Sequence, residues 1–270
     1  MAGTSGTGAA GRESAPRLSA LVVVHNEEAR LPACLEKLRF ADEVVVVLDR
    51  CTDASRAIAQ AAGARLVEGG WPIEGDRRNA GIAACTGEWV LEVDADEHVP
   101  PALAAEIRRV IAATAYDWHE ILVDNYIGAR RVRHGWGASY GKAAYPGLFR
   151  RGVKVWGRDR VHPSLTWHGR KGPMLTERID HYVDRNISDM IRRLDNYSTA
   201  KARDLRDRGE TWGSFANNLR RMVTRFFKCY LRRGGWREGG YGFLVAVFAS
   251  LYPMLSHLKA RYEKAPDEKD

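Results

Sequence analysis

Short apolar runs alternate with helical patterns over the first hundred residues of the chain. The valine-rich run Leu18–Val24 predicts a buried strand, and similar runs follow at 44–48, 64–67 and 89–93. The segments between them, at 29–38, 52–62 and 79–84, carry helical spacing. Runs that are apolar on both faces are typical of strands in a covered parallel sheet. The order therefore predicts an α/β fold, a mostly parallel sheet with helices on both faces.

The rest of the chain predicts a second half of different character. A helix is expected after Pro100, short strands and loops over 120–167, and mainly helices after His181. The first residues are rich in Gly, Ala, Ser and Thr and contain no apolar run, which indicates a flexible tail and not a signal peptide. We expect four parts: a tail at 1–17, a catalytic domain at 18–180, a helical extension at 181–262 and a tail at 263–270.

One C-terminal helix, with Asn217 as its expected cap, has a strict helical stripe of apolar residues. The stripe comprises Leu219, Met222, Val223, Phe226, Phe227, Tyr230 and Leu231. The other face is basic, with Arg220, Arg221, Arg225, Lys228, Arg232 and Arg233. Such a helix either packs on the core or lies in a membrane interface. The apolar stretch 241–255 contains Pro253 and is shorter than the roughly 20 residues of a spanning helix, so we expect no membrane span.

The charge of the chain implies an anionic partner. Lys and Arg number 42 against 34 Asp and Glu, which gives a net charge of +8. Nucleic acid, an acidic membrane surface and a phosphorylated substrate all fit this excess. The four cysteines form no CxxC pair, so neither a zinc site nor a disulfide framework is expected, and a reducing cytoplasm fits best.

Polar side chains follow the predicted strands where each one ends. Ligands of such sheets bind outside the carboxyl ends of the strands, where Asn26, Glu27, Asp49, Asp94 and Asp96 would meet. The Asp94-Ala95-Asp96 motif can hold Mg²⁺ or Mn²⁺, which in turn bridges the phosphates of a nucleotide sugar. A DxD alone is also a common solvated turn, and Asp49 can simply cap the next helix. Because several polar strand ends coincide, we favour the functional interpretation.

Several motifs, in this order and spacing, resemble the N-terminal half of family 2 glycosyltransferases. They are LVVVHNEE at 21–28, the strand ending at Asp49, RNAG at 78–81, GEWVL at 87–91 and DADE at 94–97. Further motifs are similar to those of the lipopolysaccharide core β-1,4-glucosyltransferase branch: RHGW at 133–136, LFRR at 148–151, Val161-His162 and the helix after His181. The resemblance extends over residues 18–262.

This resemblance implies a GT-A fold and inverting transfer of a sugar, glucose in this branch, from a UDP-sugar to a glycolipid such as the lipopolysaccharide core. It implies that Asp96 binds the metal directly and that the nucleotide sugar contacts His25, Asn26, Glu27, Asp49, Arg78 and Asp94. His162 and His181 are either structural residues or further ligands of the metal or diphosphate. Members of the branch carry an acid after the Val-His pair. Pro163 stands there instead, so the nearest carboxylate, Asp159, becomes the expected base.

Residues 130–160 include nine basic residues and one acidic residue, with several aromatic side chains. Such a segment can stack nucleic-acid bases or bind a phosphorylated, sugar-rich acceptor. The acidic strand ends favour the acceptor, with Arg133, Trp136 and Arg150 as its contacts, and no nucleic-acid partner. We therefore expect an enzyme bound peripherally to the inner face of the cytoplasmic membrane. Acceptors on another polysaccharide or lipid carrier, and a basic nucleic-acid-binding protein, are the alternatives.

Overall fold

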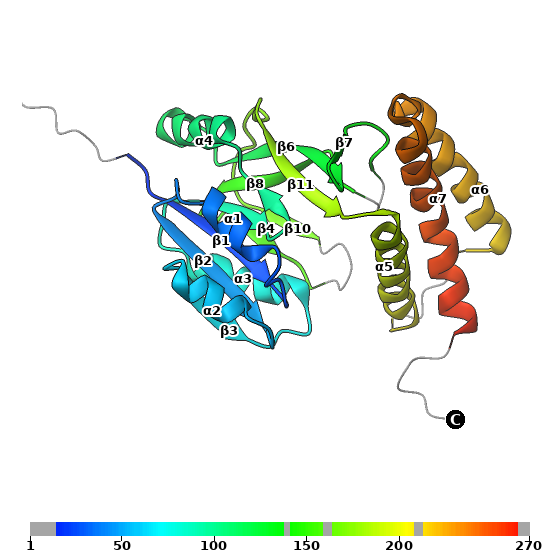
Figure 1. The fold of residues 1–270 in the computed structure, drawn as a ribbon, viewed down its shortest axis with the longest axis horizontal. Coiled ribbons are helices and arrows are strands. Elements are labelled where there is room, and N and C mark those ends of the chain that lie inside the picture. The colour runs from blue at the N-terminus through cyan, green and yellow to red at the C-terminus, as the bar shows by residue number, and fades with distance from the viewer. Residues whose placement is uncertain (1–14, 138–140, 159–163, 208–212, 264–270) are drawn as a thin grey trace, which may run out of the picture.

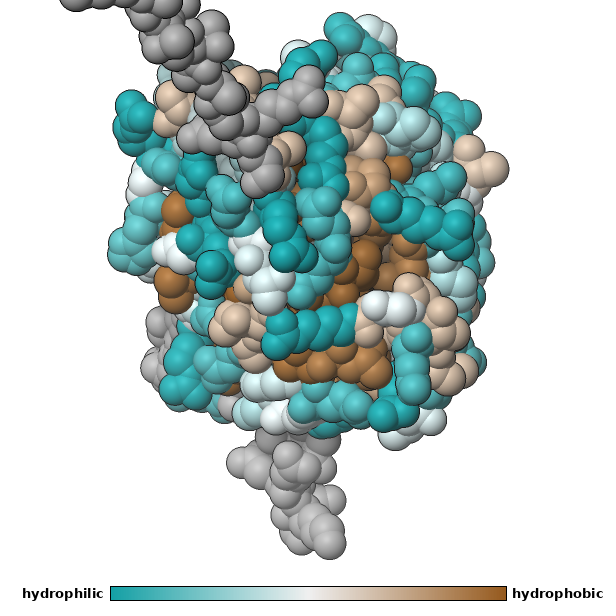
Figure 2. Space-filling view, turned by 90° about the vertical axis from the view of Figure 1, so that its left-hand side faces the viewer, coloured by the Kyte–Doolittle hydropathy of each residue, from teal (hydrophilic) through white to brown (hydrophobic). Residues whose placement is uncertain are grey.

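The computed structural model describes residues 15–137, 141–158, 164–207 and 213–263. A curved sheet with its covering helices forms one side of the molecule, and three long C-terminal helices form the other (Figure 1). The face of the sheet region that points away from those helices is hydrophilic over most of its area, with apolar side chains gathered towards its centre (Figure 2).

The N-terminal half has the parallel arrangement that the sequence predicts. Its strands stand in the order β3-β2-β1-β4 and are all parallel: β1 (Leu18–Val24), β2 (Glu43–Asp49), β3 (Arg65–Gly69) and β4 (Trp89–Asp94). The connecting helices are α1 (Leu31–Lys37), α2 (Ser55–Ala61) and α3 (Glu74–Ala84). Alternate residues of β1 enter two different apolar clusters. One contains residues of α1, α2 and α4 (Pro101–Ala113), and the other contains Ile82 of α3. Helices therefore cover both faces, and the expected fold class is confirmed.

The second half extends the same sheet in mixed orientation. After β4 the order continues β8-β6-β11-β5, with β8 antiparallel to both of its neighbours. These strands are β5 (Glu97–His98), β6 (Trp118–Ile127), β7 (Arg130–Val132), β8 (Ala144–Arg150) and β11 (Arg178–Asp184). A separate hairpin pairs β9 (Lys154–Trp156) with β10 (Leu165–Trp167). The expectation of only short strands here was wrong for β6, which pairs with β7, β8 and β11. Strand β11 also continues past the expected boundary at residue 180, and helices begin only at Ile187.

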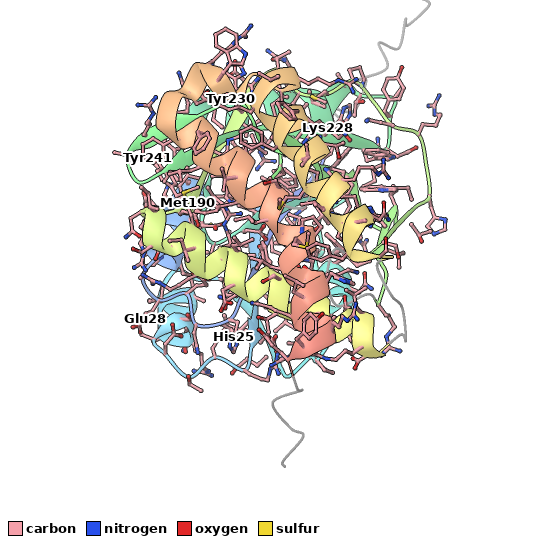
Figure 3. All side chains as sticks on the ribbon, turned by 90° about the vertical axis from the view of Figure 1, so that its right-hand side faces the viewer. His25, Glu28, Met190, Lys228, Tyr230 and Tyr241 are labelled. Atoms are coloured by element: carbon pink, nitrogen blue, oxygen red, sulfur yellow. The ribbon has the colours of Figure 1, made fainter. Side chains whose placement is uncertain are left out.

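Three helices form the C-terminal layer: α5 (Ile187–Asp207), α6 (Phe215–Phe227) and α7 (Gly239–Tyr262). A π-helical segment (Lys228–Arg232) and a 3-10 segment (Gly235–Glu238) join α6 to α7. Helix α7 lies between α5 and α6 and packs against both (Figure 3). The cap of α6 is Ser214, which accepts a hydrogen bond from the backbone of Asn217 at 3.3 Å, so Asn217 is not the cap.

Helix α7 runs unbroken through Pro253 and is longer than the apolar stretch 241–255. The stretch Gly235–Tyr262 is long and apolar enough to cross a membrane by length and composition alone. Yet 61% of its most apolar window is buried inside the protein. Val245, Ala249 and Tyr252 of α7 share one apolar cluster with Met190 and Leu194 of α5. The apolar residues of α7 therefore form the core of the helical layer.

Candidate functional site

A cavity of about 580 Å³ opens at the carboxyl ends of β1 and β4. Its wall includes six of the side chains expected at the site: His25, Glu27, Arg78, Asp94, Asp96 and His181. The other lining residues include Glu74 and Arg77 of α3, Lys142 before β8, and Arg193 and Tyr197 of α5. Helix α5 lies over the region of the His25 loop (Figure 3). The C-terminal layer thus forms part of the cavity.

Asp94 ends β4 and lies between two cations. Its carboxylate is 3.1 Å from Arg78 Nη2 and 3.3 Å from Lys142 Nζ. Its backbone N–H donates to Glu97 at 2.9 Å, which closes the turn of the DxD motif. Burial opposes the charged form of Asp94, but Arg78 and Lys142 outweigh it, so the pKa of this carboxyl lies well below its ordinary range. Asp94 is therefore ionised at any pH near neutrality.

Asp96 and His181 face each other across the cavity wall, with Asp96 Oδ2 and His181 Nε2 3.5 Å apart. The other ring nitrogen, Nδ1, lies 2.8 Å from Asn125 Oδ1. Asn125 Nδ2 donates to the Lys142 carbonyl at 2.9 Å, which fixes the amide so that Oδ1 can only accept. His181 Nδ1 must then carry the proton, and in the neutral ring Nε2 turns its lone pair towards Asp96.

This arrangement fits a divalent cation. A carboxylate oxygen and an imidazole lone pair are both metal ligands, and a ligating histidine commonly donates its second N–H to an oxygen, as His181 does to Asn125. Within the described ranges no group of three or more His, Cys, Asp or Glu residues converges on one point. Asp96 and His181 would therefore provide two ligands, and the phosphates of a bound nucleotide are suitable for the others.

Arg78 lies among three carboxylates and cannot swing freely. It binds Glu74 at 2.9 Å, Glu92 at 2.6 Å and Asp94 at 3.1 Å. Burial alone would lower the pKa of Arg78, but Asp94 and Glu92 raise it well above its ordinary value. Helix α3 reaches this position because Gly81 lets it lie close to the sheet: a Cβ there would meet Leu21 and Val47 side chains at 2.6 and 2.7 Å. Only the glycine permits that approach.

Behind Arg78 lies a second buried ion pair. Glu92, in the middle of β4, binds Lys154 Nζ of β9 at 2.7 Å, and both side chains are almost fully buried. The indole N–H of Trp156 donates to the same carboxylate at 3.3 Å. Neither Glu92 nor Lys154 was predicted from the sequence as a site residue. The one available clue was a lone glutamate inside the apolar run 89–93, where an unpaired charge would be costly.

Asp49 lies behind the cavity wall and does not line it. Its carboxylate, 1% exposed, binds Arg77 at 3.1 Å, Arg50 at 3.0 Å and the backbone N–H of Trp71 at 3.0 Å. Burial would raise the pKa of Asp49, but the hydrogen bonds from Arg50 and Trp71 and the charges of both arginines lower it. Arg77 does line the cavity. In this structure Asp49 therefore reaches the cavity through Arg77.

The loop after β1 is held in place by hydrogen bonds with the end of β2 and the residues that follow it. His25 Nδ1 lies 2.6 Å from the Asp49 carbonyl. Asn26 has a left-handed backbone (φ 57°), and its side-chain oxygen accepts from the Thr52 backbone at 2.8 Å. Glu27 then faces the cavity, and burial raises the pKa of its carboxyl. Each of the three residues that the sequence proposed here either lines the cavity or shapes the loop that lines it.

Lys142 and Glu97 also escaped the sequence analysis as site residues. They form an ion pair at 2.6 Å beside Asp94, in which Glu97 is buried and Lys142 is partly exposed. Burial raises the pKa of Glu97, whereas Glu97 and Asp94 raise the pKa of Lys142 despite burial. Glu97 could have been found because it directly follows the DxD. Lys142 could not, because only the pairing of β8 with β4 and β6 brings it to this edge.

The three residues expected to contact the acceptor do not gather at the cavity. Trp136 is 3% exposed, donates to the Val132 carbonyl at 2.6 Å and belongs to the core beneath the C-terminal helices. Arg150 pairs with Trp89, at the opposite end of β4. Arg133 makes a two-point ion pair with Asp124 at 2.8 and 2.9 Å, outside the cavity lining. Their basic or aromatic character serves packing and ion pairing. Asp159 and His162 lie outside the described residues.

The chain is similar in sequence to known glycosyltransferases. Residues 19–117 match the family described as Glycosyl transferase family 2. Over 90% of its length the chain is 26% identical to "Lipopolysaccharide core biosynthesis glycosyltransferase LpsC" of Rhizobium meliloti, of which it covers 91%. It is 24% identical to an uncharacterized glycosyltransferase of Rickettsia felis over 91% of this chain and 89% of that protein. Glucosyl-3-phosphoglycerate synthase from Mycobacterium tuberculosis is similar at 21% identity over 42% of this chain and 45% of that one, with a TM-score of 0.35.

Proposed function

We propose that this chain, which belongs to glycosyltransferase family 2, transfers glucose from a UDP-sugar to a glycolipid acceptor such as the lipopolysaccharide core, with inversion at the anomeric carbon. The observation that carries the proposal is the facing pair of Asp96 and His181 beside the cations that hold Asp94. The name of the Rhizobium meliloti relative supports the choice of acceptor, since the similarity runs over nine-tenths of both chains.

The nucleotide sugar would lie along the strand ends. The loop of His25, Asn26 and Glu27 would form one wall of the nucleoside pocket, and the Asp49–Arg77 pair would form another. Arg78 and Lys142 would face the diphosphate as fixed positive charges, with Asp94 next to the ribose and the metal. These cations are already held by carboxylates, so little reorganisation is needed when a charged leaving group forms.

Asp96 and His181 would hold Mg²⁺ or Mn²⁺, with His162 as a further ligand. A cation bound there would supply positive charge to the leaving diphosphate. Asn125 keeps the His181 ring in the ligating tautomer through its 2.8 Å contact with Nδ1. The metal would displace the present contact of Arg30 with Asp96, which is 3.6 Å long and joins side chains that are 34% and 19% exposed.

The acceptor hydroxyl would approach from the side opposite the diphosphate and attack the anomeric carbon while Asp159 removes its proton. The acceptor would enter between the sheet and α5, where Arg193 and Tyr197 line the cavity. The bidentate pair of Arg193 with Asp184, at 3.0 and 2.8 Å, keeps this wall in place. We accordingly propose a catalytic sheet domain and a helical extension that act together, on the inner face of the cytoplasmic membrane where a glycolipid acceptor lies.

A donor screen tests this function. The full chain is incubated with UDP-, GDP-, dTDP- and CMP-sugars and Mn²⁺, with and without truncated lipopolysaccharide, and the released nucleotide is measured. We expect release from UDP-glucose to rise when the acceptor is present and the product to have inverted anomeric configuration by NMR. The absence of release from every UDP-sugar would refute the proposal. RNA binding with a steep salt dependence would instead support the nucleic-acid alternative.

A further inference from the structure

Helix α6 and the π-helical segment after it present a stripe of apolar side chains to solvent. Five large apolar side chains at every fourth position point to solvent, each between 42% and 54% exposed: Phe215, Leu219, Val223, Phe227 and Leu231. The face that packs inward holds Asn218, which is fully buried, and Arg225, whose pKa burial lowers. Surface helices normally bury the apolar stripe and expose the polar one. The sequence-based stripe is thus split, and only Met222, Phe226 and Tyr230 are partly buried.

The apolar surface does not stop at α6. The ring of Phe226 lies 5.6 Å from Phe227 and 5.8 Å from Phe243 of α7, and Phe243 is itself 47% exposed. Trp236, on the connection between the two helices, is 54% exposed. These seven exposed residues (Phe215, Leu219, Val223, Phe227, Leu231, Trp236 and Phe243) form what we call the docking face. A continuous exposed apolar surface of this kind marks an interaction site.

The charges around the docking face select its partner. Arg220, Lys228, Arg232 and Arg237 are exposed on the same elements, and no acidic residue occurs between Phe215 and Arg237. A protein partner would need a strongly acidic, apolar surface to match. An anionic bilayer offers both properties at once, because its headgroups meet the basic side chains while its acyl boundary accepts the apolar ones.

We propose that the docking face lies in the interfacial layer of an anionic membrane, with α6 parallel to the bilayer plane. This inference rests on the proposed function in one respect. A lipid-anchored acceptor would explain why the enzyme binds a membrane. Helix α7 packs against both α6 and α5, and α5 carries Arg193 and Tyr197 at the cavity. The bilayer contact is thereby linked to the cavity through packed helices. Helix α7 does not cross the membrane, since most of its apolar surface is already buried in the protein.

Vesicle flotation tests the apolar part. The full chain is mixed at low salt with vesicles of phosphatidylglycerol and phosphatidylcholine in equal parts, or of phosphatidylcholine alone. The wild-type chain should float with the anionic vesicles only, and Val223→Glu/Phe227→Glu should lower its partition at least about ten-fold. The matched control Tyr116→Glu/Met174→Glu changes similarly exposed apolar residues outside the docking face and should float like the wild type.

The basic residues around the docking face are tested with a charge-matched control. Replacing Arg220, Lys228 and Arg232 with Gln should weaken binding by about five-fold per residue, whereas Arg39→Gln/Arg65→Gln/Arg109→Gln, with the same change in net charge on the sheet domain, should not. Wild-type protein that stays unbound, or control variants that lose binding equally, would overturn the proposal. So would a lipid-free dimer by light scattering that Val223→Glu/Phe227→Glu converts to a monomer, because the face would then join two copies.

The same variants separate this inference from the proposed function. Val223→Glu/Phe227→Glu should hydrolyse UDP-glucose in vesicle-free solution at the wild-type rate, because the docking face contributes nothing to the cavity. A chain that hydrolyses UDP-glucose without binding vesicles refutes the docking face and leaves the proposed function standing. A chain that floats but releases no nucleotide from any sugar supports the docking face and refutes the function.

Discussion

The cavity and the docking face depart from ordinary burial in opposite directions. In and behind the cavity, charged side chains lie in the interior: Glu92 is 2% exposed and Lys154 is 3% exposed. On α6, large apolar side chains lie in water, and Phe227 is 53% exposed. Both arrangements are costly for an isolated chain. The buried charges and the exposed apolar side chains differ in what compensates for their unfavourable environment.

In the cavity the compensation lies within the protein. Lys154, Glu92, Arg78, Asp94, Lys142 and Glu97 alternate in sign from the core to the cavity wall, each within 3.3 Å of the next. On α6 the described part of the chain offers no covering element for the apolar residues. The charges of the cavity are paired within the protein, so the cavity can receive a small charged ligand without rearrangement. The apolar face of α6 is uncovered, so only a large partner could remove it from water.

The largest expected effect concerns the cavity. Asp96→Ala should reduce kcat on the order of a thousand-fold, because it removes the carboxylate proposed to hold the metal. Asp94→Ala should cost much less, since Asp94 already has two protein cations as partners. Steady-state rates with UDP-glucose and Mn²⁺ measure the difference. Equal losses in the two variants would contradict the division of roles, and full turnover in excess EDTA would remove the metal from the account.

Breaking the buried chain of charges should reduce stability. Glu92→Gln leaves Lys154 buried without a full counter-charge and should lower the free energy of unfolding by about 3 kcal/mol. The double variant Glu92→Gln/Lys154→Met removes both charges and should recover part of that loss. Urea denaturation gives both values. A double variant as unstable as the sum of its single variants would show that the pair is not coupled.

A smaller effect is expected at the edge of the cavity. Asp49→Ala should weaken UDP binding about ten-fold, because Arg77 loses the carboxylate that fixes it at the cavity wall. Arg77→Ala should weaken it to a similar extent, and the double variant should add little further. Calorimetry on the three variants checks this. Unchanged nucleotide affinity in Asp49→Ala would reduce Asp49 to a structural residue.

The smallest effect should come from the docking face. Leu219→Ser or Val223→Ser should change the free energy of unfolding by less than about 0.5 kcal/mol, because half-exposed side chains lose little on truncation. Leu103→Ser, fully buried in α4, serves as the contrast and should cost several-fold more. A large loss in Leu219→Ser without lipid would mean that α6 packs on the protein through its apolar face and that the docking face is not free.

The sequence predicted the parallel half of the fold because its information there is local. Strands β1, β2 and β4 are largely apolar runs, and the residues at or just after their carboxyl ends are the polar ones that the sheet brings to one edge. The position of Asp94, Asp96 and the loop after β1 at this edge could therefore be predicted. His181 could be assigned only through the family resemblance, since β11 reaches the cavity by pairing with β6 and β5.

Elsewhere the decisive information was not local. Lys142 and Lys154 come from strands whose neighbours are far away in sequence, so no spacing rule links them to Asp94 or Glu92. Trp136 and Arg150 are residue types that often bind ligands. In the structure Trp136 lies in an apolar cluster and Arg150 lies at the opposite end of β4. The amphipathic pattern of α6 was visible in the sequence. The face that α6 buries, which includes Asn218, was not visible, because it depends on how α6 packs against α7.

We propose that the cavity binds a nucleoside diphosphate together with a divalent cation held by Asp96 and His181. Calorimetric titration of UDP into the full chain, with Mn²⁺ and then with EDTA, tests it most directly. We predict binding that depends on Mn²⁺, that is lost in Asp96→Ala, and that weakens about ten-fold or more in Asn125→Leu, which frees the His181 ring to adopt the other tautomer. UDP affinity that is the same in Mn²⁺ and in EDTA, for the wild type and for Asp96→Ala alike, would contradict the account.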